Sequence, residues 1–228
     1  MPAAIMYEMS IKGLFSKLFG GQRGASTQEV RKPPPEWIVI GLGNPGAKYA
    51  TTRHNVGYMA SDFLFEQLNT SASPLDYLKP VKGQPFTEAR VQLGAHPLAI
   101  IRSTTYMNES GEAVKAASEY YGVAPEKIIV LHDELDIAHG RVRVKLGGNE
   151  NGHNGLKSTT AELGTRDYVR VRMGIGRPAK GQTVINHVLS PIASGPETDA
   201  LITETVRAVE LLVTVGLQKA QHEIHTKK

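Results

Sequence analysis

The sequence predicts a single α/β domain built on a mixed β-sheet, with an appendage at its amino terminus. Short apolar runs typical of buried strands interleave with segments of helical periodicity, which is the pattern of an α/β fold. Two other segments alternate apolar and polar residues, as half-exposed antiparallel strands do, so the sheet should be of mixed direction. With 228 residues, the chain is long enough to bury a core without cross-links.

Residues 1–36 differ from the rest, and we expect a flexible extension before a domain that spans residues 37–228. Apolar residues within 11–19 recur at helical spacing, which predicts a short amphipathic helix. A glycine-containing stretch and three consecutive prolines follow it as a flexible and then a stiff spacer. The simpler interpretation is a disordered terminus or an upstream start codon. The alternative is a basic segment that targets an organelle or a membrane surface.

The first half of the domain should form a strand, a helix and a hairpin. An apolar run from Trp37 predicts a buried strand that ends in a turn. Residues of about 55–68 carry apolar side chains on one helical face. Residues 69–85 contain several prolines and should be a loop, and 89–93 and 98–102 should pair across a glycine-containing turn.

The second half continues the alternation of helices and strands. Residues 141–145 alternate valine with basic residues and should form a half-exposed strand. The expected elements are, in order, a helix over 110–121, a buried strand over 127–132, strands over 141–145 and 168–175 separated by a helix over 156–163, and one long carboxyl-terminal helix over about 197–221.

Composition excludes several classes of protein. Because the chain has no cysteine, it cannot be a disulfide scaffold, a thiol-dependent enzyme, a zinc–thiolate protein or an iron–sulfur protein. No apolar stretch approaches the roughly 18 residues that a membrane-spanning helix needs, so no membrane partner is expected. The net charge of +4 permits a polyanionic partner without requiring one.

The run from Gly41 to Gly46 fits the glycine pattern of a dinucleotide-binding loop, and Asp62 follows at a suitable distance. In such a loop the third glycine opens a helix, but here Pro45 stiffens the turn and the helical pattern starts later. We therefore interpret the run as a tight turn that points Asn44 outward at the carboxyl end of the first strand.

A histidine, an aspartate and several asparagines occupy loop positions that suit ester hydrolysis. His54 lies where a loop enters a helix, and Asp133 lies at the end of a buried strand, where ligands of α/β sheets collect. With no cysteine and no serine nucleophile motif, the natural task of His54 is to take a proton from water, with Asp133 orienting the imidazole. Asparagine amides could stabilise an oxyanion. No spaced histidine pair indicates a catalytic metal, and we expect none.

In order and spacing, the motifs resemble those of bacterial-type peptidyl-tRNA hydrolase. They are Gly41-Leu-Gly-Asn44-Pro-Gly, Tyr49, Thr52-Arg-His54-Asn-Val-Gly, Thr105-Tyr-Met-Asn108-Glu-Ser-Gly, His132-Asp133-Glu-Leu-Asp136, Lys145-Leu-Gly-Gly and Gly152-His-Asn154-Gly-Leu-Lys. The resemblance covers about residues 37–221 and leaves the appendage outside.

The resemblance implies a twisted mixed sheet wrapped by α-helices. It also implies an enzyme that cleaves the ester between a peptide and the 3′-terminal ribose of tRNA, which recycles tRNA from aborted translation. The partner would be peptidyl-tRNA, bound through its acceptor stem and 3′ end. The resemblance further implies a cytoplasmic monomer that needs no metal or other cofactor.

The same resemblance assigns roles to individual residues. It makes His54 the general base, Asp133 the group that stabilises its protonated form, and Asn44 the contact that separates blocked from free aminoacyl-tRNA. It assigns the tRNA end or the adjoining peptide to Tyr49, Tyr106, Asn108 and Asn154, and the tRNA 5′ phosphate to Lys145 and Arg172. Tyr106 stands where the family usually has phenylalanine.

Basic residues on two alternating strands agree with the last assignment. Arg141, Arg143 and Lys145 share one face of their strand, as Arg170 and Arg172 do on theirs. Together they predict a basic strip suited to a phosphate backbone, with an ordinary solvated sheet face as the alternative.

One departure from the family pattern lies in the loop before Gly152, where glycine-rich sequence is replaced by Asn149, Glu150 and Asn151. Glu150 would place a negative charge near a polyanion site. We expect weaker or slower tRNA engagement than a glycine loop would give. An unchanged KM in Glu150→Gly would contradict this.

Two other functions compete with hydrolysis of peptidyl-tRNA. The first is a non-catalytic RNA-binding or splicing-accessory protein on the same fold, against which the intact Asn44, His54 and Asp133 argue. The second is a general esterase, which would need a nucleophile motif that is absent.

Overall fold

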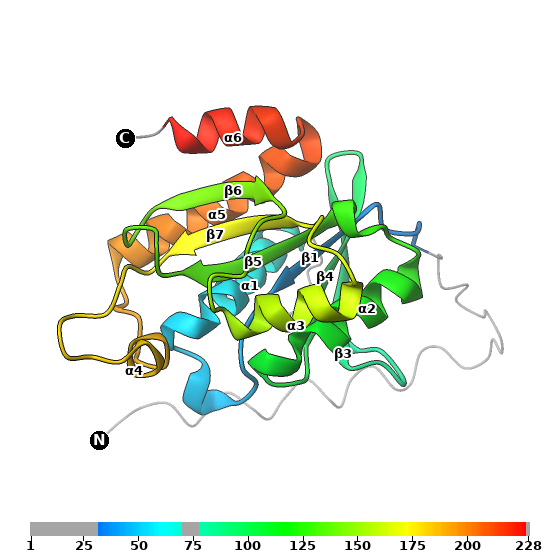
Figure 1. The fold of residues 1–228 in the computed structure, drawn as a ribbon. Coiled ribbons are helices and arrows are strands. Elements are labelled where there is room, and N and C mark those ends of the chain that lie inside the picture. Colours follow the sequence, from blue (N-terminus) through cyan, green and yellow to red (C-terminus); the bar gives the residue numbers. More distant parts are fainter. Residues whose placement is uncertain (1–31, 70–77, 227–228) are drawn as a thin grey trace, which may run out of the picture. The chain divides into compact units, whose positions relative to one another are not determined.

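The structure, a computed structural model, describes residues 32–69 and 78–226, and its compact unit begins at Pro33 (Figure 1). The helix expected within 11–19 lies outside the described residues. The division of the chain at residue 37 stays a prediction.

A seven-stranded mixed sheet forms the centre of this unit, with the order β2-β3-β4-β1-β5-β7-β6. Its inner strands β4, β1, β5 and β7 are parallel, and the pairs β2–β3, β3–β4 and β6–β7 are antiparallel. The strands are β1 (Trp37–Gly41), β2 (Lys79–Pro80), β3 (Phe86–Leu93), β4 (His96–Ser103), β5 (Ile128–Glu134), β6 (Val142–Leu146) and β7 (Val169–Gly174). The predicted mixed α/β fold is confirmed.

Helices cover both faces of the sheet, so that its central strands are buried on two sides. Figure 1 shows α2 and α3 on one face and α1 and α5 on the other. In β1, Ile38 and Ile40 pack in the apolar cluster with α2 and α3, while Val39 packs in the cluster with α1 and α5. The helices are α1 (Val56–Leu68), α2 (Ser110–Tyr121), α3 (Asn154–Leu163), α4 (Val184–Val188), α5 (Pro196–Thr214) and α6 (Leu217–His225).

The prediction of one long carboxyl-terminal helix is wrong. The chain breaks between α5 and α6 at Gly216, whose φ of 85° lies in the left-handed region that favours glycine. After the break α6 packs beside the edge strand β6, where His225 Nε2 accepts the Val144 N–H (2.9 Å) and Gln221 Nε2 donates to the Val144 carbonyl (3.0 Å). These contacts pair backbone groups that an edge strand would otherwise expose.

The expectation that β7 alternates like β6 is also wrong. In β6 the valines are buried and the basic residues are partly exposed, but in β7 Arg170 is completely buried. Its guanidinium lies against the Tyr168 ring, 4.6 Å from the centroid, and Nη1 donates to the Asn149 carbonyl (2.8 Å). The loop after β6 therefore covers part of the face that the sequence left open.

The glycine run after β1 does not open a helix, which agrees with its interpretation as a turn. A single 3₁₀ turn (Ala47–Tyr49) follows Gly46, and Asp62 lies within α1, where it pairs with Arg102.

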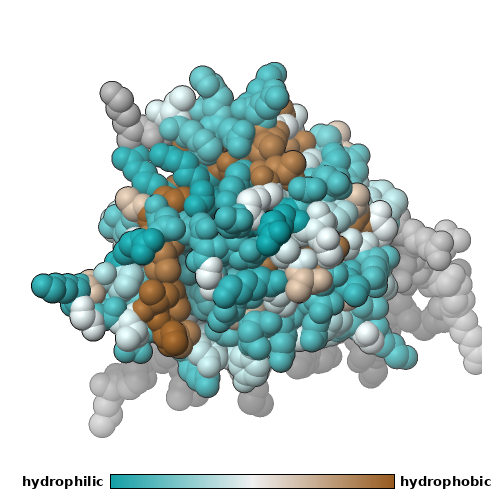
Figure 2. All heavy atoms as spheres, in the orientation of Figure 1, coloured by the Kyte–Doolittle hydropathy of each residue, from teal (hydrophilic) through white to brown (hydrophobic). Residues whose placement is uncertain are grey.

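The described surface is largely polar. Figure 2 shows a mostly hydrophilic face with a brown strip where α4 lies in Figure 1, and the exposed apolar side chains there are Val184, Ile185 and Leu189. None of the described helices is both long enough and apolar enough to cross a membrane.

Candidate active site

The carboxyl ends of the parallel strands β1 and β5 meet the start of α1, and the predicted residues gather there. Gly57 in the first turn of α1 allows this approach, because a Cβ on it would lie 2.4 Å from the Leu131 carbonyl oxygen of β5. The close contact brings His54, three residues earlier, next to Asp133 at the end of β5.

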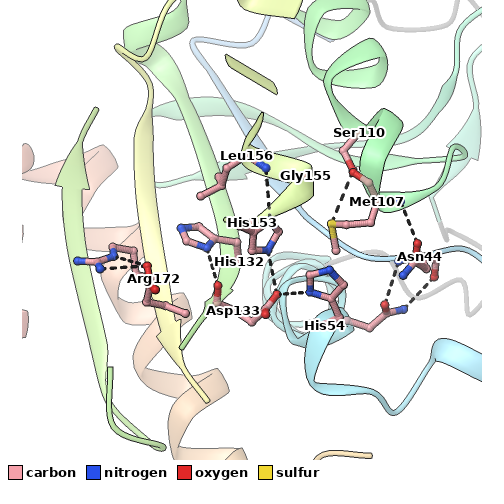
Figure 3. Close-up of polar contacts among 12 residues, drawn as sticks. Asn44, His54, Met107, Ser110, His132, Asp133, His153, Gly155, Leu156 and Arg172 are labelled. Atoms are coloured by element: carbon pink, nitrogen blue, oxygen red, sulfur yellow. Dashed lines mark hydrogen bonds and ion pairs between the residues drawn. The ribbon is translucent and has the colours of Figure 1, made fainter. Parts of the chain in front are cut away.

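His54 and Asp133 form a direct hydrogen bond. His54 Nδ1 lies 2.8 Å from Asp133 Oδ1, and the imidazole is 12% exposed while the carboxylate is buried (Figure 3). The carboxylate must accept, so Nδ1 carries a proton, and in the neutral imidazole Nε2 is the nitrogen with a free lone pair. This arrangement can accept a proton from water at Nε2 while the carboxylate holds the tautomer.

His153 contacts the same carboxylate oxygen, and sequence reasoning did not select it. Its Nδ1 accepts the Leu156 N–H at the start of α3 (3.3 Å), so its Nε2 carries the proton that is donated to Asp133 Oδ1 (3.0 Å). The two imidazole rings are 4.9 Å apart. The signal was available, since His153 directly precedes Asn154 in a loop that enters a helix.

The two histidines determine the charge of Asp133. Burial by itself would raise the pKa of this carboxyl, but His54 and His153 favour the ionised form, by hydrogen bonding and, whenever either imidazole is protonated, by its charge, and the pKa lies well below its usual range. Its neighbour His132 is fully buried, and burial lowers the pKa of that imidazole well below the usual value. Asp133 is therefore a fixed anion beneath His54, and His132 is a neutral group.

Asn44 is held in place by three buried hydrogen bonds that the sequence did not reveal. Its backbone N–H donates to Asn55 Oδ1 and its carbonyl accepts from Asn55 Nδ2, both at 2.9 Å. Its side-chain Oδ1 accepts the Met107 N–H (2.9 Å), which leaves Nδ2 as the available donor. Asn44 is only 8% exposed. We expected the turn to point it outward, but it faces the interior of the site.

The side chains assigned to tRNA or peptide binding lie around this centre at the surface. Tyr106 precedes the 3₁₀ turn that leads into α2 and is 52% exposed, and Asn108 lies within that turn. Asn154 is the exposed first residue of α3, and Tyr49 is partly exposed beside Lys48. Among the described residues, these four side chains form no hydrogen bond with one another or with the protein.

The same cluster offers three atoms that could hold a metal ion. One ligand atom each from His54, Asp133 and His153 lies within 4.8 Å of the others. However, both imidazole nitrogens that face Asp133 are used as hydrogen-bond donors, and a metal would require each to be deprotonated. The donor set therefore suits proton transfer better than metal binding.

Lys145 and Arg172 lie on one face of β6 and β7, but they differ in how strongly protein groups hold them. Register pairs Arg143 with Arg172 and Lys145 with Arg170, so all four point to the same face. Arg172 Nε and Nη2 both lie 3.0 Å from the buried Glu134 Oε2. Burial, followed by the charges of Arg172 and Arg170, lowers the pKa of Lys145. Glu134 is a partner that the sequence analysis missed.

A histidine that is hydrogen-bonded to a buried aspartate, with an asparagine amide nearby, is an arrangement suited to hydrolysis, and it lies at the carboxyl end of an α/β sheet. The comparisons with known proteins identify the family. The model of the family described as peptidyl-tRNA hydrolase matches residues 38–228, and the chain belongs to this family, whose members are enzymes that hydrolyse peptidyl-tRNA.

Two curated relatives and a solved structure agree. The chain is 45% identical to peptidyl-tRNA hydrolase 2 of Corynebacterium jeikeium (strain K411), over 99% of each sequence. It is 50% identical to peptidyl-tRNA hydrolase 2 of Corynebacterium glutamicum, over 86% of this chain and 90% of the relative. The crystal structure of the enzyme from Acinetobacter baumannii is 33% identical with a TM-score of 0.74, over 84% of this chain and 95% of that one.

Proposed function

We propose that this enzyme cleaves the ester between peptide and tRNA with His54 as general base and Asp133 as its orienting anion. The observation that carries the proposal is the 2.8 Å contact between His54 Nδ1 and Asp133 Oδ1, which makes Nε2 the proton-accepting nitrogen of the neutral imidazole. Nothing in the family or its relatives supports the alternative of a non-catalytic RNA-binding protein.

The reaction balances with water as the nucleophile. A water molecule gives its proton to His54 Nε2 as its oxygen attacks the ester carbonyl carbon. The Asn44 Nδ2 amide stabilises the oxyanion that forms. The tetrahedral intermediate then breaks its bond to the ribose oxygen, which takes the proton from His54, so that a peptide acid and tRNA with a free hydroxyl are released.

His153 acts on this step through Asp133. Because its N–H and that of His54 share one carboxylate oxygen, His153 limits how that carboxylate can rotate. We therefore place His153 among the positioning residues.

The exposed polar side chains around the centre suit the 3′ end of tRNA and the peptide beside it. Tyr49 and Tyr106 offer rings on which a base can stack, and Asn108 and Asn154 offer neutral amides for base edges or peptide groups. On the basic face, Lys145 and Arg172 would contact phosphates of the acceptor stem, at its 5′ end. We further propose a cytoplasmic monomer.

The test is release of labelled peptide from N-blocked aminoacyl-tRNA by the wild type and by His54→Ala, each with and without a chelator. We expect the variant to lose nearly all turnover while tRNA binding survives, and the wild type to be unaffected by the chelator. Full activity in His54→Ala would remove His54 from the role of base, and loss of wild-type activity with chelator would assign a metal to the site.

A further inference from the structure

The loop between β6 and α3 carries His153 into the active site, and its backbone is unusual. Gly147, Gly148 and Gly152 have φ values of 67°, 96° and 82°, and Asn151, at 48°, is the single non-glycine residue with positive φ among the described residues. A loop with so much left-handed backbone loses much conformational entropy when it is ordered. Contacts outside the backbone are needed to hold it in one form.

Residues that replace glycine in this loop supply such contacts. Glu150 Oε1 accepts from Arg166 Nε (2.8 Å), and Glu150 Oε2 accepts from Arg166 Nη2 (3.4 Å). Asn151 Nδ2 donates to Glu134 Oε2 (3.4 Å). A glycine at either position could make neither contact.

The attachment at Glu150 is connected directly to His153. The backbone N–H of His153 donates to the backbone carbonyl of Glu150 (2.8 Å). If Glu150 is fixed, His153 is therefore fixed as well, and its imidazole bonds to Asp133. The Glu150 side chain is 14% exposed, whereas that of its partner Arg166 is 56% exposed, so the loop residue is the more buried of the two.

From this geometry we propose that the Glu150–Arg166 ion pair, here called the clasp, is a positioning device that holds His153 and Asn154 in the active site. The proposal rests on the function proposed above and gives Glu150 a role that the sequence does not suggest. On sequence alone Glu150 is a charge that opposes tRNA, but in the structure that charge is paired with a cation. The clasp therefore affects turnover rather than affinity.

The experiment compares Glu150→Gln, Arg166→Gln and the double variant with Glu162→Gln as matched control. Glu162 of α3 forms an exposed ion pair with Lys115 (3.5 Å) that does not touch the loop. For each enzyme, kcat and KM are measured on N-blocked aminoacyl-tRNA, and hydrogen exchange of loop amides is measured without substrate.

We expect kcat to fall about two- to fivefold in each single variant, in keeping with a partly exposed pair, and no further in the double variant. KM should change less than twofold, loop exchange should quicken, and Glu162→Gln should match the wild type. A lower KM with unchanged kcat in Glu150→Gln would overturn the clasp in favour of repulsion of tRNA, and additive losses or no change would also overturn it.

Failure of the clasp can be told apart from failure of the proposed chemistry. The exchange measurement needs no turnover. Faster loop exchange in Glu150→Gln together with full activity in His54→Ala would support the clasp as the contact that orders the loop, and would contradict His54 as the general base. Loss of activity in His54→Ala with an unchanged loop in Glu150→Gln would do the reverse.

Discussion

The cluster of His54, Asp133 and His153, which we propose to be catalytic, and the basic face of β6 and β7 lie close together but are built differently. In the cluster, His54, Asp133 and His153 are largely buried, and each is fixed by short hydrogen bonds from separate elements. On the basic face, Lys145 is partly exposed. Arg172 forms an ion pair with the Glu134 carboxylate and could exchange this partner for a phosphate. Chemistry requires fixed geometry, whereas attraction of a phosphate backbone requires mainly positive charge, and each region suits the task that we propose for it.

The largest effect should come from Asp133→Asn, which tests whether the cluster depends on an anion at this position. The amide would lose the charge and present an N–H to one imidazole, so the tautomers of His54 and His153 would be disturbed. By analogy with other aspartate-oriented histidines, kcat should fall on the order of a thousandfold or more. Steady-state kinetics should show KM within about threefold of wild type.

Asp136→Asn is the matched control for that variant. Asp136 lies in the same run but at the surface, where it pairs with Arg177. It should retain wild-type kcat. If Asp133→Asn kept most of its activity, the cluster would not be the catalytic centre.

A smaller effect, on binding alone, is expected for Lys145→Ala. Removal of one phosphate contact should raise KM several-fold and reduce the salt slope of binding by about 1, with kcat unchanged. Lys219→Ala, exposed on α6, serves as control. An equal salt slope in Lys145→Ala and wild type would exclude this lysine from phosphate contact.

Arg172 requires a different design, because its removal leaves Glu134 buried without a cation. Arg172→Ala should therefore lower stability as well as affinity. The double variant Arg172→Ala with Glu134→Gln separates the two effects, since it should recover stability but not tRNA binding.

The smallest effect should be a pH dependence of stability that comes from His132, the buried neighbour of Asp133. Burial lowers the pKa of His132, so the folded state binds its proton less readily than the unfolded state. Its contribution is complete above the unfolded pKa of about 6.5 and is lost as the pH falls below it, by up to about 1.4 kcal/mol per pH unit.

The free energy of unfolding, measured from pH 7.5 to 5.0, checks this prediction. His132→Asn keeps a donor for the Asp133 carbonyl and should show a shallower dependence on pH. His225 has the same sign, because burial also lowers its pKa, and it should account for part of the slope that remains. A slope in His132→Asn as steep as the wild type's would contradict the assignment.

Sequence patterns predicted the elements well where one physical signal acted alone. The helix over 110–121 has the bounds of α2, and the predicted hairpin is β3 with β4. The prediction failed at α5 and α6, because apolar periodicity continues across Gly216 while the backbone reverses its handedness there. It also failed at Arg170, since an arginine that alternates with valines gives no sign that a loop will cover it.

The sequence by itself determined the fold class, the family and the residues that could carry out ester hydrolysis, because these depend on local patterns and residue chemistry. The tertiary structure decided how those residues are held: the shared oxygen of Asp133, the reciprocal bonds of Asn44 and Asn55, and the pairing of Arg172 with Glu134. Each joins segments that lie at least eleven residues apart in the chain. Contacts of that kind arise from packing of whole elements, which no local pattern encodes.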